Sequence, residues 1–295
     1  MTEYDTDVLV SPDWVEDHLE EFQADDPDYR LVEIESPEPP DNDFPSTYEE
    51  THIPGAVGLN WATDLSDQDQ RDILKKADFE ELVGEIGISE DSTVVFYGDG
   101  HIPNWFAVFA YWEFTYYGHD DVRVLDGGKD YWVENDYPLT EEAPDFPTQE
   151  YAARGPFESI RSYRTTSTRP ARPASRWSTS ARPKSSPARR SPPEGLQETA
   201  QRGGHIPGAS NVPVKTNLQD DGRFKGPEEL EELYAEEGID GDESVVTYCR
   251  VGERSAIAWF ALHELLGYDD VTNYDGSWTE WGNLVRAPIE TGDGD

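Results

Sequence analysis

Short apolar runs alternate with amphipathic stretches along most of the chain. In the first half, the runs at 31–34 and 93–97 are typical of buried strands. Apolar side chains at helical spacing predict helices over 13–22, 79–87, 104–117 and 129–135. Strands buried on both faces and alternating with helices are characteristic of a parallel sheet covered by helices. The pattern therefore predicts an α/β fold.

The second half repeats the landmarks of the first. His-Ile-Pro-Gly-Ala occurs at 52–56 and again at 205–209, and Thr-Val-Val-Phe-Tyr at 93–97 is matched by Ser-Val-Val-Thr-Tyr at 244–248. An Asp-Gly turn occurs at 126–127 and again at 275–276. Conserved order with slightly drifting offsets indicates two tandem related domains, each a parallel sheet flanked by helices. We expect a first domain over 1–146, a linker over 147–193 and a second domain over 194–292.

The chain has one cysteine, Cys249, between the predicted strand at 244–248 and an apolar helix at 256–266. A thiol at a helix N-terminus lies close to unpaired backbone N–H groups and to the positive end of the helix dipole, and both favour the thiolate. Arg250 and Arg254 flank it, and Gly252 permits a tight turn. This arrangement predicts a nucleophile that attracts an anionic substrate; an inert buried thiol is the competing interpretation.

The charge balance is extreme. Aspartate and glutamate total 63 against 23 lysine and arginine, which gives a formal net charge of −40. Such a surface repels nucleic acid and anionic membranes. Nine tryptophans, 15 tyrosines and 11 phenylalanines favour a folded protein over an acidic disordered one. Because high salt screens self-repulsion, we expect a halophilic, cytoplasmic globular protein.

Metal and cofactor signals are weak. One cysteine excludes an internal disulfide and disfavours a thiolate metal site. The six histidines form no pair with metal-ligand spacing, no apolar run has membrane-spanning length, and the first residues do not resemble a signal peptide. We expect no metal and no cofactor. The histidines of the repeated motif, His52 and His205, are expected to tie a Pro-Gly turn to its neighbours rather than to act in catalysis.

Two segments of the second half carry a family resemblance. The loop at 248–255 reads Tyr-Cys-Arg-Val-Gly-Glu-Arg-Ser, and 273–281 reads Asn-Tyr-Asp-Gly-Ser-Trp-Thr-Glu-Trp. With the repeat, they resemble the two-domain rhodanese family of sulfurtransferases over most of 7–290. The Cys-Arg-x-Gly loop is similar to that of the thiosulfate-using branch, whereas mercaptopyruvate enzymes typically have Cys-Gly-Ser-Gly. The resemblance implies a thiosulfate sulfurtransferase that moves sulfane sulfur to cyanide or a thiol acceptor through a cysteine persulfide.

The resemblance also implies roles for individual residues. Cys249 would be the catalytic residue that carries the persulfide. The implied substrate-binding residues are Arg250, Val251, Gly252, Glu253, Arg254 and Ser255. Their backbone N–H groups would surround the sulfur anion, the arginines would bind the oxygens of the donor, and the serine hydroxyl would add a hydrogen bond. Asp275 and Trp278 are expected to form the pocket wall, with turn capping and packing as their respective alternatives. The position of Cys249 is taken by Gly98 in the first domain, which is therefore expected to be catalytically inactive.

Three other functions remain open at this stage. A 3-mercaptopyruvate sulfurtransferase is the first alternative. Protein phosphatases and arsenate reductases use a Cys-x5-Arg loop, and the Cys-x4-Arg spacing from Cys249 to Arg254 favours a sulfur atom over phosphate. A non-catalytic persulfide carrier, which would relay sulfur to a partner protein, is the third. The expected partners are a small anionic sulfur donor, a thiol or cyanide acceptor and, as a candidate, a sulfur-relay protein.

The segment at 159–193 differs from the rest of the chain. It has no aspartate or glutamate, and it contains nine of the 23 basic residues among many Ser, Thr, Pro and Ala. Its composition is typical of a disordered basic linker. A nucleic-acid-binding arm is the functional alternative, although such an arm would bind little on a strongly acidic protein in high salt.

A reading-frame shift also accounts for this segment. When each codon is formed from the last base of one codon and the first two bases of the next, the stretch from Ser178 onward can read Val-Asp-Val-Arg-Ser-Pro, which resembles the opening of this segment in the family. We therefore hypothesise a frameshift over roughly 160–193. As it stands, the second domain is expected to lack the counterpart of the strand at 31–34, and no residue matches the substrate-binding arginine that the resemblance implies after that strand.

Overall fold

The computed structural model describes Tyr4, residues 6–35, 47–98, Gly100, and residues 102–164, 176–179 and 200–291. The chain divides into two compact units. The N-terminal unit comprises Thr6–Phe157 with Asp220–Phe224, and the C-terminal unit comprises Glu158–Gln219 with Lys225–Asp295 and Met1–Asp5.

The division between the units falls inside the predicted linker at 147–193. Residues on its N-terminal side are held to the N-terminal unit, since Gln149 N donates to Gly84 O at 2.9 Å and Gly155 N to Tyr117 O at 2.8 Å. On the other side, Ser162 N donates to Asn273 O at 2.9 Å in the C-terminal unit. Backbone hydrogen bonds therefore carry both units into the segment that composition alone marks as a linker.

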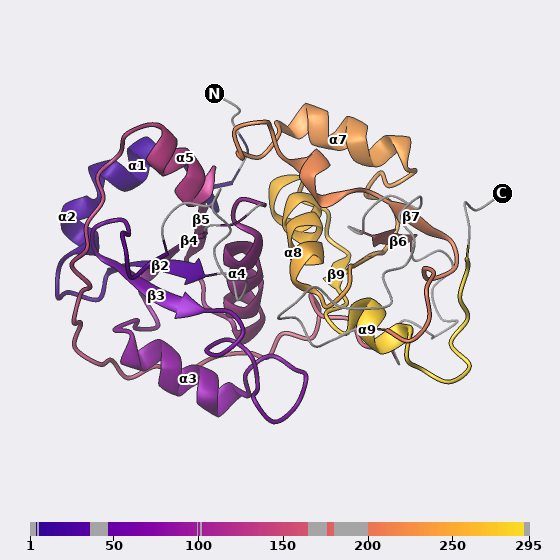
Figure 1. Cartoon of the computed structure of the whole chain (residues 1–295), viewed down its shortest axis with the longest axis horizontal. Coiled ribbons are helices and arrows are strands. Elements are labelled where there is room, and N and C mark those ends of the chain that lie inside the picture. The colour runs from indigo at the N-terminus through magenta and orange to yellow at the C-terminus, as the bar shows by residue number, and fades with distance from the viewer. Residues whose placement is uncertain are drawn as a thin grey trace. The chain divides into compact units, whose positions relative to one another are not determined.

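A five-stranded parallel sheet forms the centre of the N-terminal unit, in the order β1-β5-β4-β2-β3 (Figure 1). The central strands are buried along nearly their whole length, as a sheet covered on both faces requires. The strands are β1 (Leu9–Val10), β2 (Tyr29–Glu35), β3 (Ala56–Asn60), β4 (Thr93–Gly98) and β5 (Val122–Leu125).

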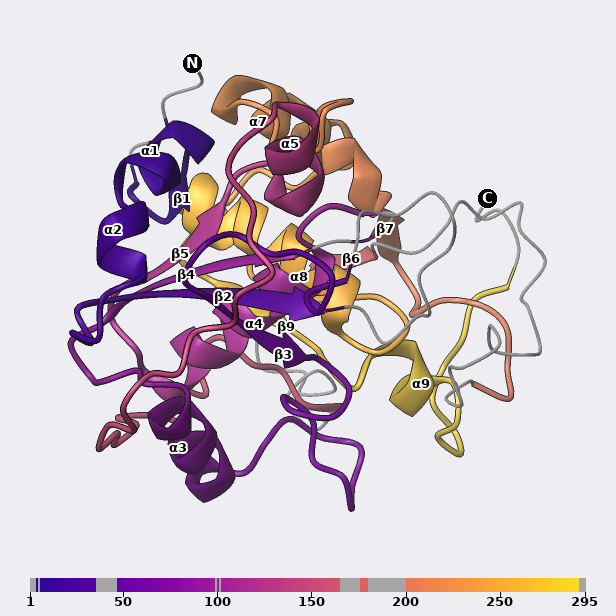
Figure 2. The ribbon, with the colours of Figure 1, turned by 60° about the vertical axis from the view of Figure 1, so that its left-hand side comes forward.

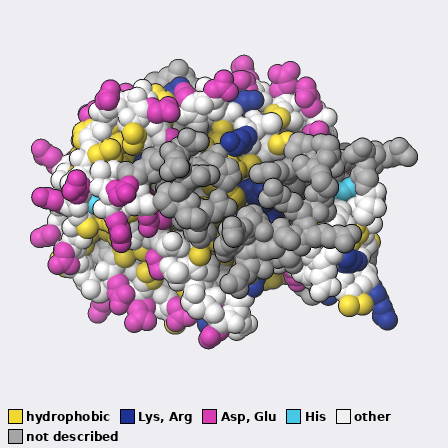
Figure 3. All heavy atoms as spheres, in the orientation of Figure 1, with side chains coloured by type: hydrophobic (Ala, Val, Ile, Leu, Met, Phe, Trp, Pro, Cys, Tyr) yellow, Lys and Arg dark blue, Asp and Glu magenta, His cyan; other side chains and the backbone are white. Residues whose placement is uncertain are grey.

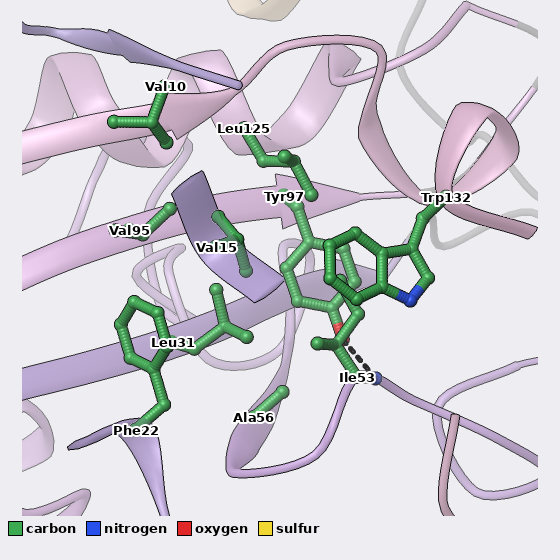
Figure 4. Close-up of a cluster of buried hydrophobic side chains, with 10 residues drawn as sticks. All are labelled: Val10, Val15, Phe22, Leu31, Ile53, Ala56, Val95, Tyr97, Leu125 and Trp132. Carbon is green, nitrogen blue, oxygen red and sulfur yellow. Dashed lines mark hydrogen bonds between the residues drawn. The ribbon is translucent and has the colours of Figure 1, made fainter. Parts of the chain in front are cut away.

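Helices α1 (Pro12–Asp17), α2 (Leu19–Phe22) and α5 (Gly128–Glu134) cover one face of this sheet (Figure 2). Their side chains Val15, Phe22 and Trp132 pack in one buried cluster with Leu31 of β2 and Tyr97 of β4 (Figure 4). The single helix predicted over 13–22 is two helices, because the backbone at 18 leaves the helical conformation at φ −108° and ψ 14°.

Helices α3 (Lys76–Glu85) and α4 (Trp105–Tyr117) cover the opposite face. The ring of Phe114 in α4 lies 4.8 Å from that of Phe96 in β4 and 4.9 Å from that of Phe79 in α3. Helix α4 is buried on almost all sides, which explains its apolar composition. It ends at Gly118, whose φ of 84° is the left-handed conformation that favours glycine after a helix.

The C-terminal unit has a four-stranded parallel sheet in the order β7-β6-β8-β9. Helix α8 runs directly into the π-helical turn η2, and together they match the helix predicted over 256–266. The elements are β6 (Arg176–Thr179), β7 (Ala209–Asn211), η1 (Val214–Asn217), α7 (Pro227–Glu236), β8 (Val245–Tyr248), α8 (Glu253–Phe260), η2 (Ala261–Leu265), β9 (Val271–Asn273) and α9 (Ser277–Trp281).

The repeat seen in the sequence is present in three dimensions. Tyr97 at the end of β4 accepts a hydrogen bond from Ile53 N at 3.1 Å, and Tyr248 at the end of β8 accepts one from Ile206 N at 3.2 Å. The expectation of two sheets of parallel strands flanked by helices is confirmed.

One prediction about the second domain is wrong. Strand β6 occupies the place that the sequence left empty, between β7 and β8, with Trp177 opposite Ala209 and Ser178 opposite Ser210. In the N-terminal unit, β2 pairs with β3 and β4 in the same way, with Leu31 opposite Ala56. A segment without an apolar run therefore forms this strand, because hydrogen bonds to the neighbours on both sides supply what the apolar pattern lacks.

The acidic composition is expressed on the surface. Aspartate and glutamate side chains are spread over the visible face of the described residues rather than gathered in one patch (Figure 3). A dispersed arrangement keeps like charges apart, and salt screens what repulsion remains. In the described part of the chain, no helix combines the length and apolar character needed to cross a membrane.

Candidate active site

Cys249 lies at the carboxyl end of β8, in the turn that leads to α8. Its side chain is buried, with 1% of its surface exposed. Gly252 N donates a hydrogen bond to Cys249 Sγ at 3.2 Å, so a backbone N–H at the start of α8 points at the sulfur. This is the local arrangement that the sequence predicts, and a backbone donor of this kind stabilises negative charge on sulfur.

Gly252 is needed for the shape of this turn. Its φ of +98° is left-handed, and a Cβ added there would lie 2.4 Å from Asp275 Cα. The close approach brings the cysteine turn against the turn that follows β9. A side chain at position 252 would push the two turns apart.

The turn between β9 and α9 holds the other side of the cysteine loop. Ser277 Oγ accepts from Cys249 N at 3.0 Å, Trp278 N donates to Cys249 O at 3.2 Å, and Thr279 N donates to Arg250 O at 2.9 Å. The first turn of α9 therefore binds the backbone around the sulfur. Trp278 itself is half-buried, and its Nε1 donates to Arg202 O at 3.0 Å.

Asp275 takes part in a buried ion pair. Arg161 Nε lies 3.1 Å from Asp275 Oδ1, and Nη2 lies 2.8 Å from Oδ2, which is a bidentate arrangement. Both side chains are more than nine-tenths buried. Arg161 was not identified from the sequence, because it lies in the segment with anomalous composition. Ile160 O accepts from Asn273 N at 2.9 Å, so the backbone around Arg161 makes an isolated parallel bridge with β9.

Ser255 and Asn273 support the cysteine loop from within the core. Ser255 Oγ lies 2.8 Å from Gly252 O and 2.7 Å from Asn273 Oδ1, and Asn273 Nδ2 donates to Gly252 O at 3.1 Å. Both are buried. These contacts fix the carbonyl of Gly252, and the role of Ser255 as a substrate ligand stays a prediction. Asn273 was not identified from the sequence, although it lies in the segment that carries the resemblance.

The side chain of Glu253 faces the sulfur. Cys249 Sγ donates to Glu253 Oε2 at 3.5 Å, and Glu253 is 2% exposed. A buried carboxylate next to a thiol is unusual, because burial without a partner is costly for a charged group. The resemblance points only to the backbone of this residue, and the side-chain contact is visible only in the structure.

Arg250 and Arg254 are half-buried. Val251, which lies between Arg250 and Gly252 in the loop, is buried. Arg250 Nε is buried, and it has no hydrogen-bond partner among the described residues. A guanidinium N–H without a hydrogen-bond partner in the described part of the chain, on the residue next to Cys249, is available to bind an anion.

The corresponding edge of the N-terminal unit is filled by its own side chains. Gly98 N donates to Asn104 Oδ1 at 3.1 Å. Beyond it, Lys129 Nζ lies 2.6 Å from Glu33 Oε1, and both side chains are fully buried. Tyr97 OH donates to Glu33 Oε2 at 2.6 Å, and burial together with the charge of Glu33 raises the pKa of Tyr97. An ion pair therefore occupies the end of the strands in the unit that lacks the cysteine.

The repeated histidines make the contacts expected of turn residues. His52 Nδ1 and Nε2 lie 2.9 and 3.1 Å from Tyr48 O and Glu142 O, and His205 Nε2 lies 3.4 Å from Glu290 Oε2. In the described part of the chain, no three His, Cys, Asp or Glu side chains are grouped as a metal site requires. The position of the arginine implied after β6 falls outside the described residues.

Comparison with known proteins decides the family. The rhodanese-like domain profile matches residues 11–135 and 171–284, so it covers both repeats. The chain belongs to the rhodanese-like domain family. The resemblance seen in the sequence is thereby confirmed.

Full-length relatives of this rhodanese-like chain are known. It is 58% identical over 291 residues to a protein of Haloferax volcanii named "Putative thiosulfate sulfurtransferase", and the match covers 99% of both chains. It is 44% identical to the "Sulfur carrier protein TtuD" of Thermus thermophilus over 97% of this chain and 98% of that one. The structure of SseA from Escherichia coli, named as a 3-mercaptopyruvate sulfotransferase, is similar with a TM-score of 0.74 and 27% identity, over 92% of this chain and 99% of that one. Sulfur transfer is common to these names, and the sulfur donor differs among them.

Proposed function

We propose that this rhodanese-like protein is a thiosulfate sulfurtransferase, which passes sulfane sulfur to a thiol or cyanide through a persulfide on Cys249. The observation that carries the proposal is the position of Cys249 Sγ, 3.2 Å from Gly252 N at the start of α8, in a loop that also contains Arg250 and Arg254. The name of the Haloferax volcanii relative supports thiosulfate as the donor. The acidic composition and that relative support a halophilic, cytoplasmic setting.

The geometry supports a reaction in two halves. The Cys249 thiolate attacks the outer sulfur of thiosulfate, the bond between the two sulfur atoms breaks, and sulfite leaves with the electron pair. An acceptor anion then attacks the sulfur held on Cys249, and the thiolate leaves. Two transfers of this kind replace one difficult transfer and give ping-pong kinetics.

The loop supplies binding and charge stabilisation. The N–H of Gly252 already points at the sulfur, and the remaining loop N–H groups are proposed to stabilise the persulfide anion in the same way. Arg250 and Arg254 are proposed to bind the sulfonate oxygens of the donor, and the buried Nε of Arg250, which has no hydrogen-bond partner among the described residues, supports this role. Asp275 and Trp278 stand behind the loop, and we assign them to its support.

The N-terminal unit is proposed to be catalytically inactive. Gly98 cannot act as a nucleophile, and the buried pair of Lys129 and Glu33 fills the end of its strands. We further propose that its function is structural.

The test is sulfite release from thiosulfate in molar potassium chloride, with the Cys249→Ser variant as control. The intact enzyme should release one equivalent of sulfite before acceptor is added and should gain roughly 32 daltons, one sulfur atom, on Cys249. The variant should do neither. Retained turnover in Cys249→Ser would exclude the nucleophile, and faster turnover of 3-mercaptopyruvate than of thiosulfate would reassign the donor. Persulfide formation without discharge to cyanide or small thiols would favour the sulfur carrier instead.

A further inference from the structure

We propose that Glu253 is a catalytic residue that shares one proton with Cys249 and holds it while the sulfur carries negative charge. This inference rests on the proposed sulfur transfer. Its starting point is the contact of 3.5 Å between Cys249 Sγ and Glu253 Oε2. Both side chains are almost completely buried, so water does not screen the pair.

The position of Glu253 in α8 explains why its side chain points at the sulfur. Residue 253 is the first residue of α8, four positions after Cys249, and the chain turns sharply at Gly252 between them. The backbone of the turn is fixed by Ser255 and Asn273 through Gly252 O, and by Ser277 through Cys249 N. The carboxylate is therefore held beside the sulfur by the same contacts that shape the loop.

Charge is the reason why the proton must stay in the pair. A thiolate and a carboxylate at this distance in a buried site would repel each other, and an anionic donor would raise the repulsion further. If the thiol proton passes to Glu253 as the thiolate forms, the pair keeps a net charge of −1 throughout. The same holds for the persulfide anion beside a protonated carboxyl group.

The steps balance without any other reactant. In the first half, the proton moves from Cys249 Sγ to Glu253 Oε2, Sγ forms a bond to the outer sulfur of thiosulfate, and sulfite leaves with the electrons of the broken bond. In the second half, the acceptor anion forms a bond to that sulfur, the bond to Sγ breaks with its electrons on Sγ, and Sγ recovers the proton from Glu253. In the product state, Sγ again donates to Glu253 Oε2, across the contact of 3.5 Å in the structure.

Other charged groups surround the pair and must be considered in any pH experiment. Arginine side chains remain protonated at every pH in which the protein can be assayed. The acidic groups next to the site have partners of their own, since Asp275 pairs with Arg161 and Glu280 accepts from Tyr274 OH at 2.6 Å. The charged and titratable groups on the loop and on the elements around it come from several segments. They are Arg250 and Arg254 in the loop and α8, Tyr248 in β8, Arg161, Arg164, Tyr274 and Asp275 around β9, Glu280 in α9, Lys215 in η1, and His263 and Glu264 in η2.

The test compares the intact enzyme with Glu253→Gln, which keeps the shape of the side chain but cannot hold the proton, and with Glu253→Asp, which keeps the carboxyl group. The measured quantities are the rate of the sulfite burst and the rate of persulfide discharge to sulfite, from about pH 5 to about pH 9. In the intact enzyme and in Glu253→Asp, the burst rate should pass through a maximum and fall by about tenfold per pH unit once the shared proton is lost. In Glu253→Gln it should rise to a plateau, and discharge should be about 100-fold slower than in the intact enzyme.

A role of Glu253 in packing alone would give a different result. Glu253→Gln would then lower the rate by the same factor at every pH and would keep the shape of the profile, and that result would overturn the proposal. Urea unfolding of each variant shows whether the fold is intact. If Glu253→Gln disturbs the fold, the pH profile of Glu253→Asp still tests the proposal. If the intact enzyme forms no persulfide at all, the proposed function fails, whereas persulfide formation with an unchanged profile in Glu253→Gln refutes only the proton transfer.

Discussion

The guanidinium of Arg161 makes a bidentate ion pair with the carboxylate of Asp275, and Asp275 Cα is the atom closest to the position where a side chain on Gly252 would begin. The pair thus lies directly behind the loop that carries Cys249. It links residues near the start of the C-terminal unit to the turn after β9. A buried pair of this kind fixes the positions of both backbones, because neither charge can turn to solvent.

Arg161→Ala should destabilise the protein by about 3–5 kcal/mol, because it leaves Asp275 buried without its partner. The free energy of unfolding in urea measures the loss, and the sulfite burst should slow in the same variant. Lys75→Ala is the control, since Lys75 is 58% exposed and its partner Asp67, which is 6% exposed, keeps hydrogen bonds from Asp69 N and Gln70 N. If Arg161→Ala and Lys75→Ala lowered the free energy of unfolding equally, the buried pair would not stabilise the protein more than an exposed lysine does.

Gly252→Ala should abolish sulfur transfer, with a loss of at least about 100-fold in the burst rate, because the new Cβ would displace Asp275 and the loop. Gly267→Ala is a matched control: φ at this glycine is +67°, and nothing lies within 4 Å of an added Cβ. Both variants carry the cost of a left-handed backbone, about 1–2 kcal/mol. Only the first should lose activity, and similar losses in both would trace the effect to backbone strain.

The sequence predicted the parts of this site that depend on local order. A strand, a cysteine, a glycine and an apolar helix in succession place Cys249 under an N–H of α8, and the structure has that arrangement. The contacts of Arg161 with Asp275 and of Ser255 with Asn273 join segments far apart in the chain, and their geometry depends on the pairing of β9 with its neighbours. Periodicity and spacing carry no information on such contacts.

Asp126 should make the stability of the protein fall as pH rises. Burial raises the pKa of Asp126 from 3.8 to about 7. The equivalent aspartate of the C-terminal unit, Asp275, forms an ion pair with Arg161. In the N-terminal unit, the residue that corresponds to Arg161 is the uncharged Leu9 of β1. A raised carboxyl pKa means that the folded state binds the proton more tightly than the unfolded state, so its stabilisation is complete below about pH 4 and is lost as pH rises through about 7.

Asp126→Asn removes this titration and keeps the oxygen that accepts from Phe224 N. Urea unfolding at about pH 5 and about pH 8 measures the effect. The variant should be more stable than the natural protein at the higher pH, by at most about 4 kcal/mol, and the difference should shrink at the lower pH. If the difference in unfolding free energy between the two proteins were the same at both pH values, Asp126 would be ionised in the folded protein throughout this range.

Strand β6 shows where the sequence pattern was misleading. The segment has no apolar run, yet its backbone pairs with β7 and β8 as β2 pairs with β3 and β4. Its register places Ser178 at the position of Val32, opposite Ser210 as Val32 lies opposite Val57. The proposed frameshift yields valine at 178.

Ser178→Val should therefore stabilise the protein. Ser178 is fully buried, and its Oγ has no hydrogen-bond partner among the described residues. Removal of a buried hydroxyl without a partner relieves a cost of about 1–3 kcal/mol, and the added methyl groups enter a position that holds Val32 in the other unit. Ser210→Val, on the neighbouring strand, is the contrasting control and should give no gain in stability, because the half-exposed Ser210 Oγ donates to Glu237 O at 3.1 Å. Urea unfolding compares the two, and a loss of stability in Ser178→Val would count against valine at this position.

The intact mass of the natural protein tests the reading frame itself. A mass equal to that calculated from the sequence, 33.3 kDa, would refute the frameshift even if the substitution is stabilising.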